Sequence, residues 1–254
     1  MAERKKSEPE PSLVDLSIRV IKTNKSKVAS RPLMDQGVIP KGISSVIFNG
    51  RSGSGKSTLL VNLLSRPEFF GPPGKRGYFD EIHLFAPTGG TDDMFDSLKI
   101  PLRNVHMKPT ARQLESLMKK QKKVIDRKGV DKAPKMLVIL EDCQSCKRFL
   151  GSEAVKQAFI ANRHFNMSTW ICGQSFTLTP RACRLQANNI FYFRGSGSEK
   201  KLMIDEFCPS GLTKAEFADL VGHAVAEPYS FLHINMGHRE ETRFRKGLGV
   251  ILSI

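Results

Sequence analysis

The stretch SVIFNGRSGSGKSTLLVNLL, which occupies residues 45–64, decides the fold of this 254-residue chain. Residues 45–48 predict a short buried strand, and the apolar spacing after Ser57 predicts a helix. Between the two, Gly50 and the triplet Gly-Lys-Ser at residues 55–57 have the spacing of a phosphate-binding loop. We therefore predict an α/β protein that binds a nucleotide, and the question is what the nucleotide is used for.

Each residue type in this loop has a chemical role. Glycines let the backbone wrap around an anion without a side chain in the way. The backbone amides and the positive end of the helix then face the phosphates. We expect Lys56 to reach the β- and γ-phosphates of ATP, and the Ser57 hydroxyl to bind Mg²⁺. The expected nucleotide-binding residues are Gly50, Arg51, Ser52, Gly53, Ser54, Gly55, Lys56, Ser57 and Thr58.

The composition limits the class of protein. Forty Lys and Arg residues against 25 Asp and Glu residues give a net charge of +15. Such a charge favours a polyanionic partner, most simply nucleic acid, although basic nucleotide enzymes also occur for reasons of solubility. No run of 18 apolar residues exists, and the N-terminus has no apolar segment, so neither a membrane span nor secretion is expected. Five scattered cysteines suit a reducing compartment.

The order of the predicted elements indicates the domain organisation. Residues 1–30 are polar, charged and weakly periodic, which predicts a mobile basic arm ahead of an ATPase domain over residues 31–254. In that domain, strands alternate with helices, which predicts a mainly parallel sheet with crossover helices. The predicted strands are residues 45–48, 78–87, 136–140, 167–175, 188–195, 229–236 and 245–254, and the predicted helices are residues 57–64, 109–129, 151–165, 198–207 and 213–222.

Polar side chains end two of the buried strands. The strand at residues 136–140 is apolar on both faces and ends in Glu141 and Asp142. In phosphate-binding-loop enzymes, a carboxylate at the tip of such a strand holds Mg²⁺ through its waters, and a neighbouring carboxylate activates the attacking water. Gln174 ends the next strand, where a polar side chain can sense the γ-phosphate and orient that water. These residues predict ATP hydrolysis.

The chain resembles the genome-packaging ATPases of large double-stranded DNA viruses and virophages, the poxvirus-type branch of the FtsK–HerA superfamily. The resemblance rests on GRSGSGKST (50–58), LVILEDC (137–143) and ANRHFNMSTWICGQSFTLTPRACRLQANNIFYFRG (161–195), and it extends over residues 31–254. It implies an additional-strand (ASCE, RecA-like) P-loop NTPase core, a three-layer sandwich that assembles as a homo-oligomeric ring.

The same resemblance implies a function and partners. The ring would hydrolyse ATP with Mg²⁺ to drive double-stranded DNA into a capsid, irrespective of sequence. Its partners would then include capsid or portal-like proteins. The expected location is the host cytoplasm or a viral factory, or else the virion.

One position departs from the family pattern. The family commonly places Asp at the Mg²⁺ position and Glu or Asp after it, whereas this chain has Glu141 followed by Asp142. Glutamate is one methylene longer and still reaches a metal-bound water. We assign Glu141 to Mg²⁺ and Asp142 to the attacking water, and the reverse assignment stays open.

Among the residues assigned so far, only Lys56 would neutralise the negative charge on the transferred γ-phosphoryl group. Related NTPases supply a further cation as an arginine finger from a neighbouring subunit. The candidates are Arg163, just before the strand that ends in Gln174, and Arg181 and Arg184, just after it. We favour Arg163, with Arg184 next.

Three alternatives to a packaging motor stay open at this point. A nucleoside or nucleotide kinase also uses a phosphate-binding loop, and Arg181 and Arg184 resemble the arginine lid that such kinases place over phosphates. Another DNA translocase or helicase of the same superfamily would share every residue named above. A scaffold that binds ATP without hydrolysing it is disfavoured, because each catalytic position holds a chemically competent residue.

Overall fold

The computed structural model of the chain describes residues 32–40, 42–74, 77–87 and 93–253. The arm expected over residues 1–30 lies outside these residues, so the boundary at residue 31 stays a prediction. Within the described residues, nine strands form one sheet in the order β3-β2-β4-β5-β1-β6-β7-β8-β9. The strands are β1 Ser45–Asn49, β2 Glu81–Phe85, β3 Val105–His106, β4 Met136–Glu141, β5 Met167–Gly173, β6 Asn189–Phe193, β7 Phe231–Asn235, β8 Phe244–Lys246 and β9 Val250–Ile251.

The sheet is mainly parallel, as predicted. Strands β1 to β6 pair in parallel with one another, whereas β6 with β7, β7 with β8 and β8 with β9 pair antiparallel. The prediction of one strand over residues 245–254 was wrong. Two short strands form there instead, because Gly247 turns the chain with a φ of 62°.

Helices flank most of the strands along the chain. They are α1 Pro32–Asp35, α2 Lys56–Ser65, α3 Asp93–Asp96, α4 Ala111–Lys128, α5 Lys147–Leu150, α6 Glu153–Ile160, α7 Arg181–Gln186, α8 Gly197–Phe207, α9 Lys214–Ala224 and α10 Glu240–Arg243. The helix predicted over residues 151–165 is shorter than expected, since α6 is followed by the 3₁₀ turn η4 Asn162–Phe165. Among the described residues, no helix combines the length and the apolar run that crossing a membrane requires.

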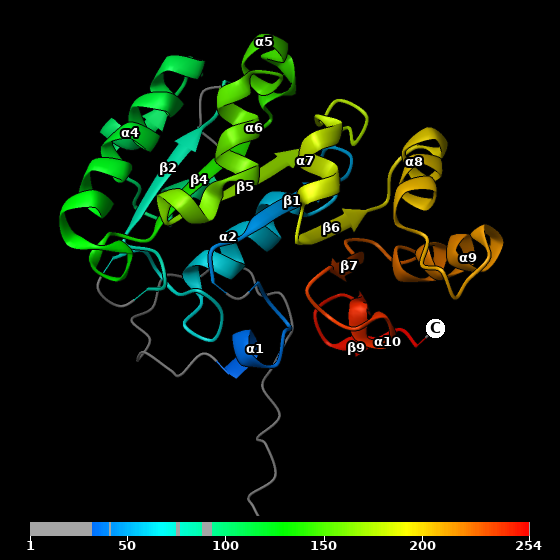
Figure 1. The fold of residues 1–254 in the computed structure, drawn as a ribbon. Coiled ribbons are helices and arrows are strands. Elements are labelled where there is room, and N and C mark those ends of the chain that lie inside the picture. The colour runs from blue at the N-terminus through cyan, green and yellow to red at the C-terminus, as the bar shows by residue number, and fades with distance from the viewer. Residues whose placement is uncertain (1–31, 41, 75–76, 88–92, 254) are drawn as a thin grey trace, which may run out of the picture.

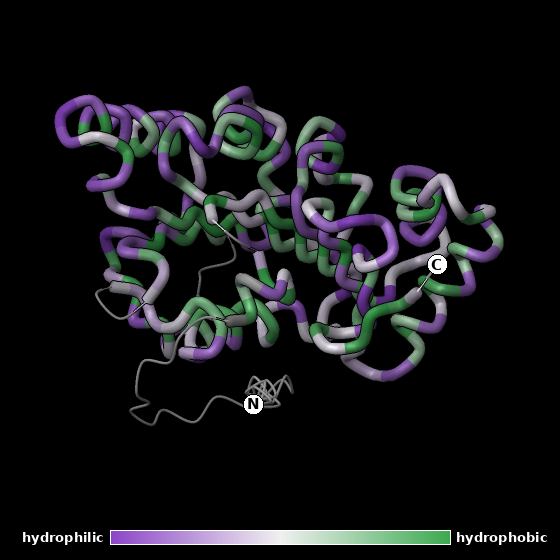
Figure 2. The backbone as a smooth tube through the Cα atoms, turned by 60° about the horizontal axis from the view of Figure 1, so that its bottom comes forward, coloured by the Kyte–Doolittle hydropathy of each residue, from purple (hydrophilic) through white to green (hydrophobic). Residues whose placement is uncertain are grey.

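Two hydrophobic clusters lie on opposite faces of the sheet, as the alternation of side chains along a strand dictates. In β4, Val138 and Leu140 join a cluster with α4 and α6, whereas Leu137 and Ile139 join one with α2. Figure 1 shows α4, α6 and α7 over one face of the sheet, and Figure 2 shows hydrophobic residues along the central strands. Burial on both faces explains why these strands read as continuous apolar runs in the sequence.

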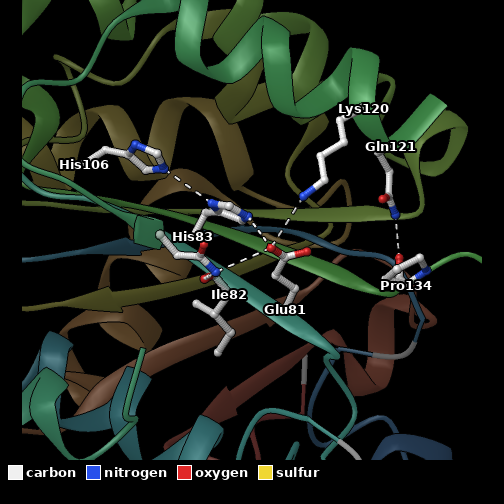
Figure 3. Close-up of polar contacts among 8 residues, drawn as sticks. Glu81, Ile82, His83, His106, Lys120, Gln121 and Pro134 are labelled. Atoms are coloured by element: carbon white, nitrogen blue, oxygen red, sulfur yellow. Dashed lines mark hydrogen bonds and ion pairs between the residues drawn. The ribbon is translucent and has the colours of Figure 1, made fainter. Parts of the chain in front are cut away.

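Thr110 is the N-cap of α4, as predicted, and its side chain forms a capping box with Gln113. Beneath the helix lies a polar chain at the edge of the sheet (Figure 3). His83 Nε2 is 3.1 Å from Glu81 Oε1, and His83 Nδ1 is 3.3 Å from His106 Nε2. Burial lowers the pKa of His83, so this buried ring is neutral and joins the two neighbours by hydrogen bonds.

Candidate nucleotide-binding and hydrolysis site

The carboxyl ends of β1, β4 and β5 meet at one edge of the sheet. Asn49 at the end of β1 pairs with Gly173 at the end of β5, and Glu141 at the end of β4 pairs with Cys172. This register brings the segments that follow the three strands around a cavity of about 460 Å³. Its lining residues are Ser52, Gly53, Gly55, Lys56, Ser57, Thr58, Ala86, Met94, Phe95, Glu141, Asp142, Gln174 and Tyr229.

The loop between β1 and α2 requires glycine at two positions. A Cβ on Gly50 would lie 2.5 Å from Phe193 Cβ, and Gly55 has a φ of 99°. Gly55 is also the residue that caps α2, and it makes no side-chain capping bond. The start of α2 therefore presents backbone amides and the positive end of its dipole to the cavity, where an anion is stabilised.

Lys56 is the first residue of α2 and is buried. Its Nζ donates a hydrogen bond to the backbone oxygen of Arg51, at 2.9 Å across the loop. The ammonium group thus lies inside the curve of the loop, where the predicted role requires it. Of the loop residues predicted to bind nucleotide, Gly50, Arg51 and Ser54 do not line the cavity, and Gly50 instead packs against β6.

Ser57 and Glu141 meet across the cavity. Ser57 Oγ donates a hydrogen bond to Glu141 Oε1 at 3.0 Å. The other carboxylate oxygen, Oε2, is buried and has no hydrogen-bond partner among the described residues. Burial, together with the nearby negative charge of Asp142, raises the pKa of Glu141 to about 7.

These two residues fit a magnesium site. A divalent cation beside Glu141 would offset the cost of a buried carboxylate and engage its unpaired oxygen. The described residues contain no group of three His, Cys, Asp or Glu side chains suited to a metal. A metal here would therefore complete its coordination with phosphate oxygens and water, as Mg²⁺ usually does.

Asp142 and Gln174 form the other half of the site. Gln174 Nε2 donates a hydrogen bond to Asp142 Oδ2 at 3.1 Å, so the predicted base and the predicted water-orienting amide meet. Asp142 has a left-handed backbone, with a φ of 45°, and this turn directs the chain away from β4. The strained backbone is stabilised by the bond from Asp142 N to the Cys172 oxygen at 2.9 Å.

The position of Gln174 depends on residues that the sequence reasoning did not identify. Gln144 Oε1 accepts hydrogen bonds from Gln174 N at 2.9 Å and from Ser175 N at 3.0 Å. Glu199, at the start of α8, accepts bonds from Ser175 Oγ at 2.9 Å and from Thr177 Oγ1 at 3.1 Å, and another from Phe176 N. Glu199 is 24 positions from Ser175 in sequence, so no local pattern indicated this contact.

Tyr229 is a further residue that the sequence reasoning missed. It lines the cavity although it belongs to the segment before β7, and its side chain is 72% exposed. A Cβ on Gly55 would lie 3.5 Å from its ring. Its φ of 63° is unusual for a bulky residue, and such strain concentrates at functional sites. An exposed aromatic ring held in this way beside a phosphate-binding loop is a suitable surface for a nucleotide base.

The arginines have different environments. Arg184 is buried, and its Nε and one terminal nitrogen each lie 2.7 Å from an oxygen of Glu206. Its other terminal nitrogen bonds to the backbone oxygens of Thr179 and Phe176. All three nitrogens of this guanidinium are hydrogen-bonded within the chain, so none is left to bind a phosphate in a neighbouring subunit. We therefore correct the second-choice assignment: Arg184 is structural, and it does not fit an arginine finger or a kinase lid.

Arg163 and Arg181 are exposed. Arg181 is at the start of α7, and its guanidinium nitrogen is 4.0 Å from Glu206. Arg163 lies in η4, ahead of the N-terminal end of β5. Because Gln174, directly after the other end of β5, lines the cavity, Arg163 lies at the opposite edge of the sheet and cannot serve the cavity of its own chain. A role for Arg163 in catalysis thus requires a second subunit.

Comparison with known proteins finds viral and bacterial proteins that are similar to the chain. No protein-family profile matches the chain. The uncharacterized protein 075L of Invertebrate iridescent virus 6 is 26% identical over 155 residues, which are 60% of this chain and 55% of that protein. The matched part therefore spans about half the length of this curated relative.

Solved structures of NTPases share the fold. The genome packaging NTPase B204 from Sulfolobus turreted icosahedral virus 2, in complex with AMP, superposes with a TM-score of 0.54 and 16% identity over 84% of this chain and 98% of that one. The DNA-packaging ATPase B204 from Sulfolobus turreted icosahedral virus superposes with a TM-score of 0.52 and 15% identity, and the match covers 76% of this chain and 93% of that one. The cytoplasmic domain of the type VII secretion ATPase EccC from Thermomonospora curvata superposes with a TM-score of 0.52 and 14% identity. This match covers 78% of this chain and 25% of that one. At these identities the likeness establishes the fold.

Proposed function

We propose that the chain is an ATP-hydrolysing motor that moves double-stranded DNA and packages a viral genome into a capsid. The observation that carries this proposal is the hydrogen bond between Gln174 and Asp142 at a cavity that Lys56 also lines. A hydrolase must hold a water molecule beside the γ-phosphate with a base and an orienting group. A nucleoside kinase instead places its second substrate there and excludes water. The pair therefore favours hydrolysis over phosphoryl transfer to a nucleoside.

The residues divide the chemical work as follows. The loop amides and Lys56 bind the β- and γ-phosphates of ATP and neutralise the charge that develops on them. Ser57 and Glu141 would hold Mg²⁺, which supplies charge neutralisation on the phosphate oxygens when bound. Asp142 accepts a proton from the attacking water, and Gln174 orients that water. Since the Gln174 amide contacts the Asp142 carboxylate, both groups can contact one water molecule.

Tyr229 supplies the surface for the base in this proposal. Its exposed ring borders the cavity next to Gly55. Stacking on an aromatic ring stabilises a base by about 0.5–1.5 kcal/mol. Every base has an aromatic face, so stacking alone does not select adenine.

The fold supports the narrower family assignment. Strand β5 lies between β1, which precedes the phosphate-binding loop, and β4, which carries the acidic pair, as the additional-strand class requires. With helices over both faces, this order supports a three-layer RecA-like core. We assign the chain to the FtsK–HerA superfamily and its poxvirus-type branch, on the sequence resemblance and on the shared fold with two viral packaging proteins.

Charge supports DNA as the partner. The net charge is +15, and α4 exposes seven cations, which would contact phosphates without reading bases. They are Arg112, Lys119, Lys120, Lys122, Lys123, Arg127 and Lys128. We further infer a homo-oligomeric ring, in which Arg163 would complete the active site of a neighbouring subunit. Capsid or portal-like proteins would be its partners, in the host cytoplasm, a viral factory or the virion.

One experiment tests the proposed function. ATP hydrolysis is measured with and without duplex DNA, and phosphoryl transfer to nucleoside monophosphates is measured alongside. We expect DNA-stimulated hydrolysis without transfer, and its loss in Lys56→Ala but not in Lys108→Ala, which removes an exposed lysine away from the cavity. Transfer to a nucleoside monophosphate, or full hydrolysis by Lys56→Ala, would contradict the proposal.

A further inference from the structure

A second cavity lies on the same edge of the sheet as the nucleotide cavity. Its volume is about 430 Å³, and it lies where β6 ends and α8 begins, against the C-terminal part of α9. Strand β6 is the parallel neighbour of β1, so the segment after β6 lies beside the phosphate-binding loop. The lining residues that matter here are Tyr192, Arg194, Gly195, Ser196, Lys200 and Gly222.

The backbone at this cavity is suited to an anion. Helix α8 has 11 residues and begins with Ser196 as its cap, so the positive end of its dipole is at the cavity. Gly195, Gly197 and Gly222 line it without side chains, which leaves the backbone accessible. A helix start of this kind binds phosphate groups when other donors face the same space.

Tyr192 supplies such a donor. Its side chain is 1% exposed and lines the cavity, and its hydroxyl has no hydrogen-bond partner of good geometry among the described residues, although it lies against the backbone of Gly195. Burial raises the pKa of Tyr192 to about 12, so the hydroxyl stays protonated and can donate. A buried hydroxyl left unpaired costs about 1–3 kcal/mol, which a bound acceptor would recover.

Two cationic side chains line the cavity. Arg194 and Lys200 both line it, and no ion pair with an acidic residue holds either of them in the described part of the chain. Glu199, the acidic residue of the first turn of α8, bonds to Ser175 and Thr177 instead. The negative charge of Glu199 and, more weakly, the positive charge of Arg51 in the phosphate-binding loop both act on the Tyr192 hydroxyl.

We propose that this cavity binds a phosphodiester group of the DNA backbone, with Arg194, Lys200, the Tyr192 hydroxyl and the start of α8 as its donors. The inference rests on the proposed function, because it assigns the DNA contact of that motor. Donors of this kind recognise the phosphate and not the base, as a motor that moves along a whole genome requires.

The site is linked to hydrolysis by two short contacts. Phe193 precedes Arg194, and its Cβ lies against Gly50 of the phosphate-binding loop. Glu199 in the first turn of α8 bonds to the segment that directly follows Gln174. A phosphate that draws the start of α8 toward itself therefore acts on both sides of the nucleotide cavity. This gives a physical route by which DNA would stimulate hydrolysis.

The test uses the double variant Arg194→Gln/Lys200→Gln in the full chain. The control is Lys201→Gln, which removes one exposed lysine from the same helix. Binding of a fluorescent duplex is followed by anisotropy without ATP, at several salt concentrations. We expect the double variant to lose at least about tenfold in DNA affinity. The slope of its affinity against salt concentration should correspond to the release of about two fewer counterions. The control should stay within about twofold of the wild type. Tyr192→Phe should weaken DNA binding about threefold.

The rates of hydrolysis complete the test. Without DNA, the double variant should hydrolyse ATP at the wild-type rate, and DNA should no longer stimulate it. A DNA affinity equal to that of Lys201→Gln would overturn the site. A raised KM for ATP with unchanged DNA binding would show that the cavity holds a nucleotide phosphate, and would overturn it too. If the double variant loses DNA affinity but the wild type never hydrolyses ATP, the site stands and the proposed motor function fails.

Discussion

The Ser57 hydroxyl and the Glu141 carboxylate are 3.0 Å apart, although 84 positions separate them in the sequence. The neighbouring Asp142 carboxylate contacts Gln174 instead. The two acids at the end of β4 therefore have different partners, one beside the proposed Mg²⁺ ligand Ser57 and one beside the proposed water-orienting residue Gln174. This geometry favours Glu141 for Mg²⁺ and Asp142 for the attacking water.

That division predicts different phenotypes for two isosteric variants. Asp142→Asn should bind Mg²⁺-ATP normally and hydrolyse it about 10²-fold more slowly, because the base is lost. Glu141→Gln should weaken nucleotide binding in the presence of Mg²⁺ but not in its absence. Calorimetric titration with and without Mg²⁺, together with turnover measurements, separates the two. An exchange of the two phenotypes would show that the assignment is reversed.

The raised pKa of Glu141 predicts two opposite pH dependences. Mg²⁺-ATP binding needs the ionised carboxylate, so the affinity should increase as the pH rises through about 7. In the free protein the folded state retains a proton that the unfolded chain releases near pH 4.5, so folding stability should fall between pH 4.5 and about 7. The loss from this group is on the order of 3 kcal/mol.

The comparison with Glu141→Gln isolates this effect. Burial lowers the pKa of His83. This histidine therefore makes the folding stability rise with pH below 6.5, which is opposite to the effect of Glu141. The difference in unfolding free energy between wild type and Glu141→Gln cancels the histidine contribution. Equal pH dependence of the two proteins in chemical denaturation would contradict the raised pKa.

Gln144 should act as a positioning residue. Its side chain holds the backbone amides of Gln174 and Ser175, and it does not line the cavity. Gln144→Ala should lower kcat by about tenfold while KM for ATP changes little, because the orienting amide is displaced and the phosphates are still bound. Gln157→Ala is the control, since Gln157 is exposed on α6. A rise in KM at constant kcat would indicate a binding role instead.

Tyr229 should contribute to nucleotide affinity through its ring. Tyr229→Ala should raise KM for ATP by about 3- to 10-fold, while Tyr229→Phe should leave it unchanged. Tripolyphosphate, which has no base, should inhibit the wild type and Tyr229→Ala equally well. If Tyr229→Ala also loses affinity for tripolyphosphate, the residue supports the phosphate-binding loop and does not contact the base.

The two candidate arginines should separate into a catalytic and a structural residue. Arg163→Ala should fold normally and lose about 10³-fold in hydrolysis, and activity should return when it is mixed with Lys56→Ala. Mixed rings contain interfaces with both an intact loop and an intact arginine. Arg184→Ala should instead lower the unfolding free energy by about 3 kcal/mol or more, because the largely buried Glu206 loses both short bonds and keeps only Arg181 at 4.0 Å.

Two results would contradict this separation. No recovery at any mixing ratio, despite proven co-assembly, would rule out Arg163 acting on a neighbour. A fully active Arg163→Ala would transfer the role to Arg181, the remaining exposed candidate.

Local sequence was enough to predict the elements that depend on near neighbours. Residues 45–64 form the strand, loop and helix as predicted, and Thr110 caps α4. These features depend on the backbone freedom of glycine, on a capping side chain and on apolar spacing, all of which act within a few residues. The C-terminal strand was predicted less well. The spacing of apolar residues alone does not show whether Gly247 and Gly249 continue a strand or form a turn.

The roles of individual polar residues depended on contacts that only the folded chain makes. The sequence by itself determined that a phosphate-binding loop, an acidic strand end and a polar strand end exist. Parallel strands place their carboxyl ends at one edge, so their convergence followed from the topology. The sequence could not show that Arg184 pairs with Glu206, that Glu199 holds the segment after Gln174, or that Tyr229 returns to the loop. Each of these contacts joins distant parts of the chain, and its energy comes from burial that exists only once the whole sheet has formed.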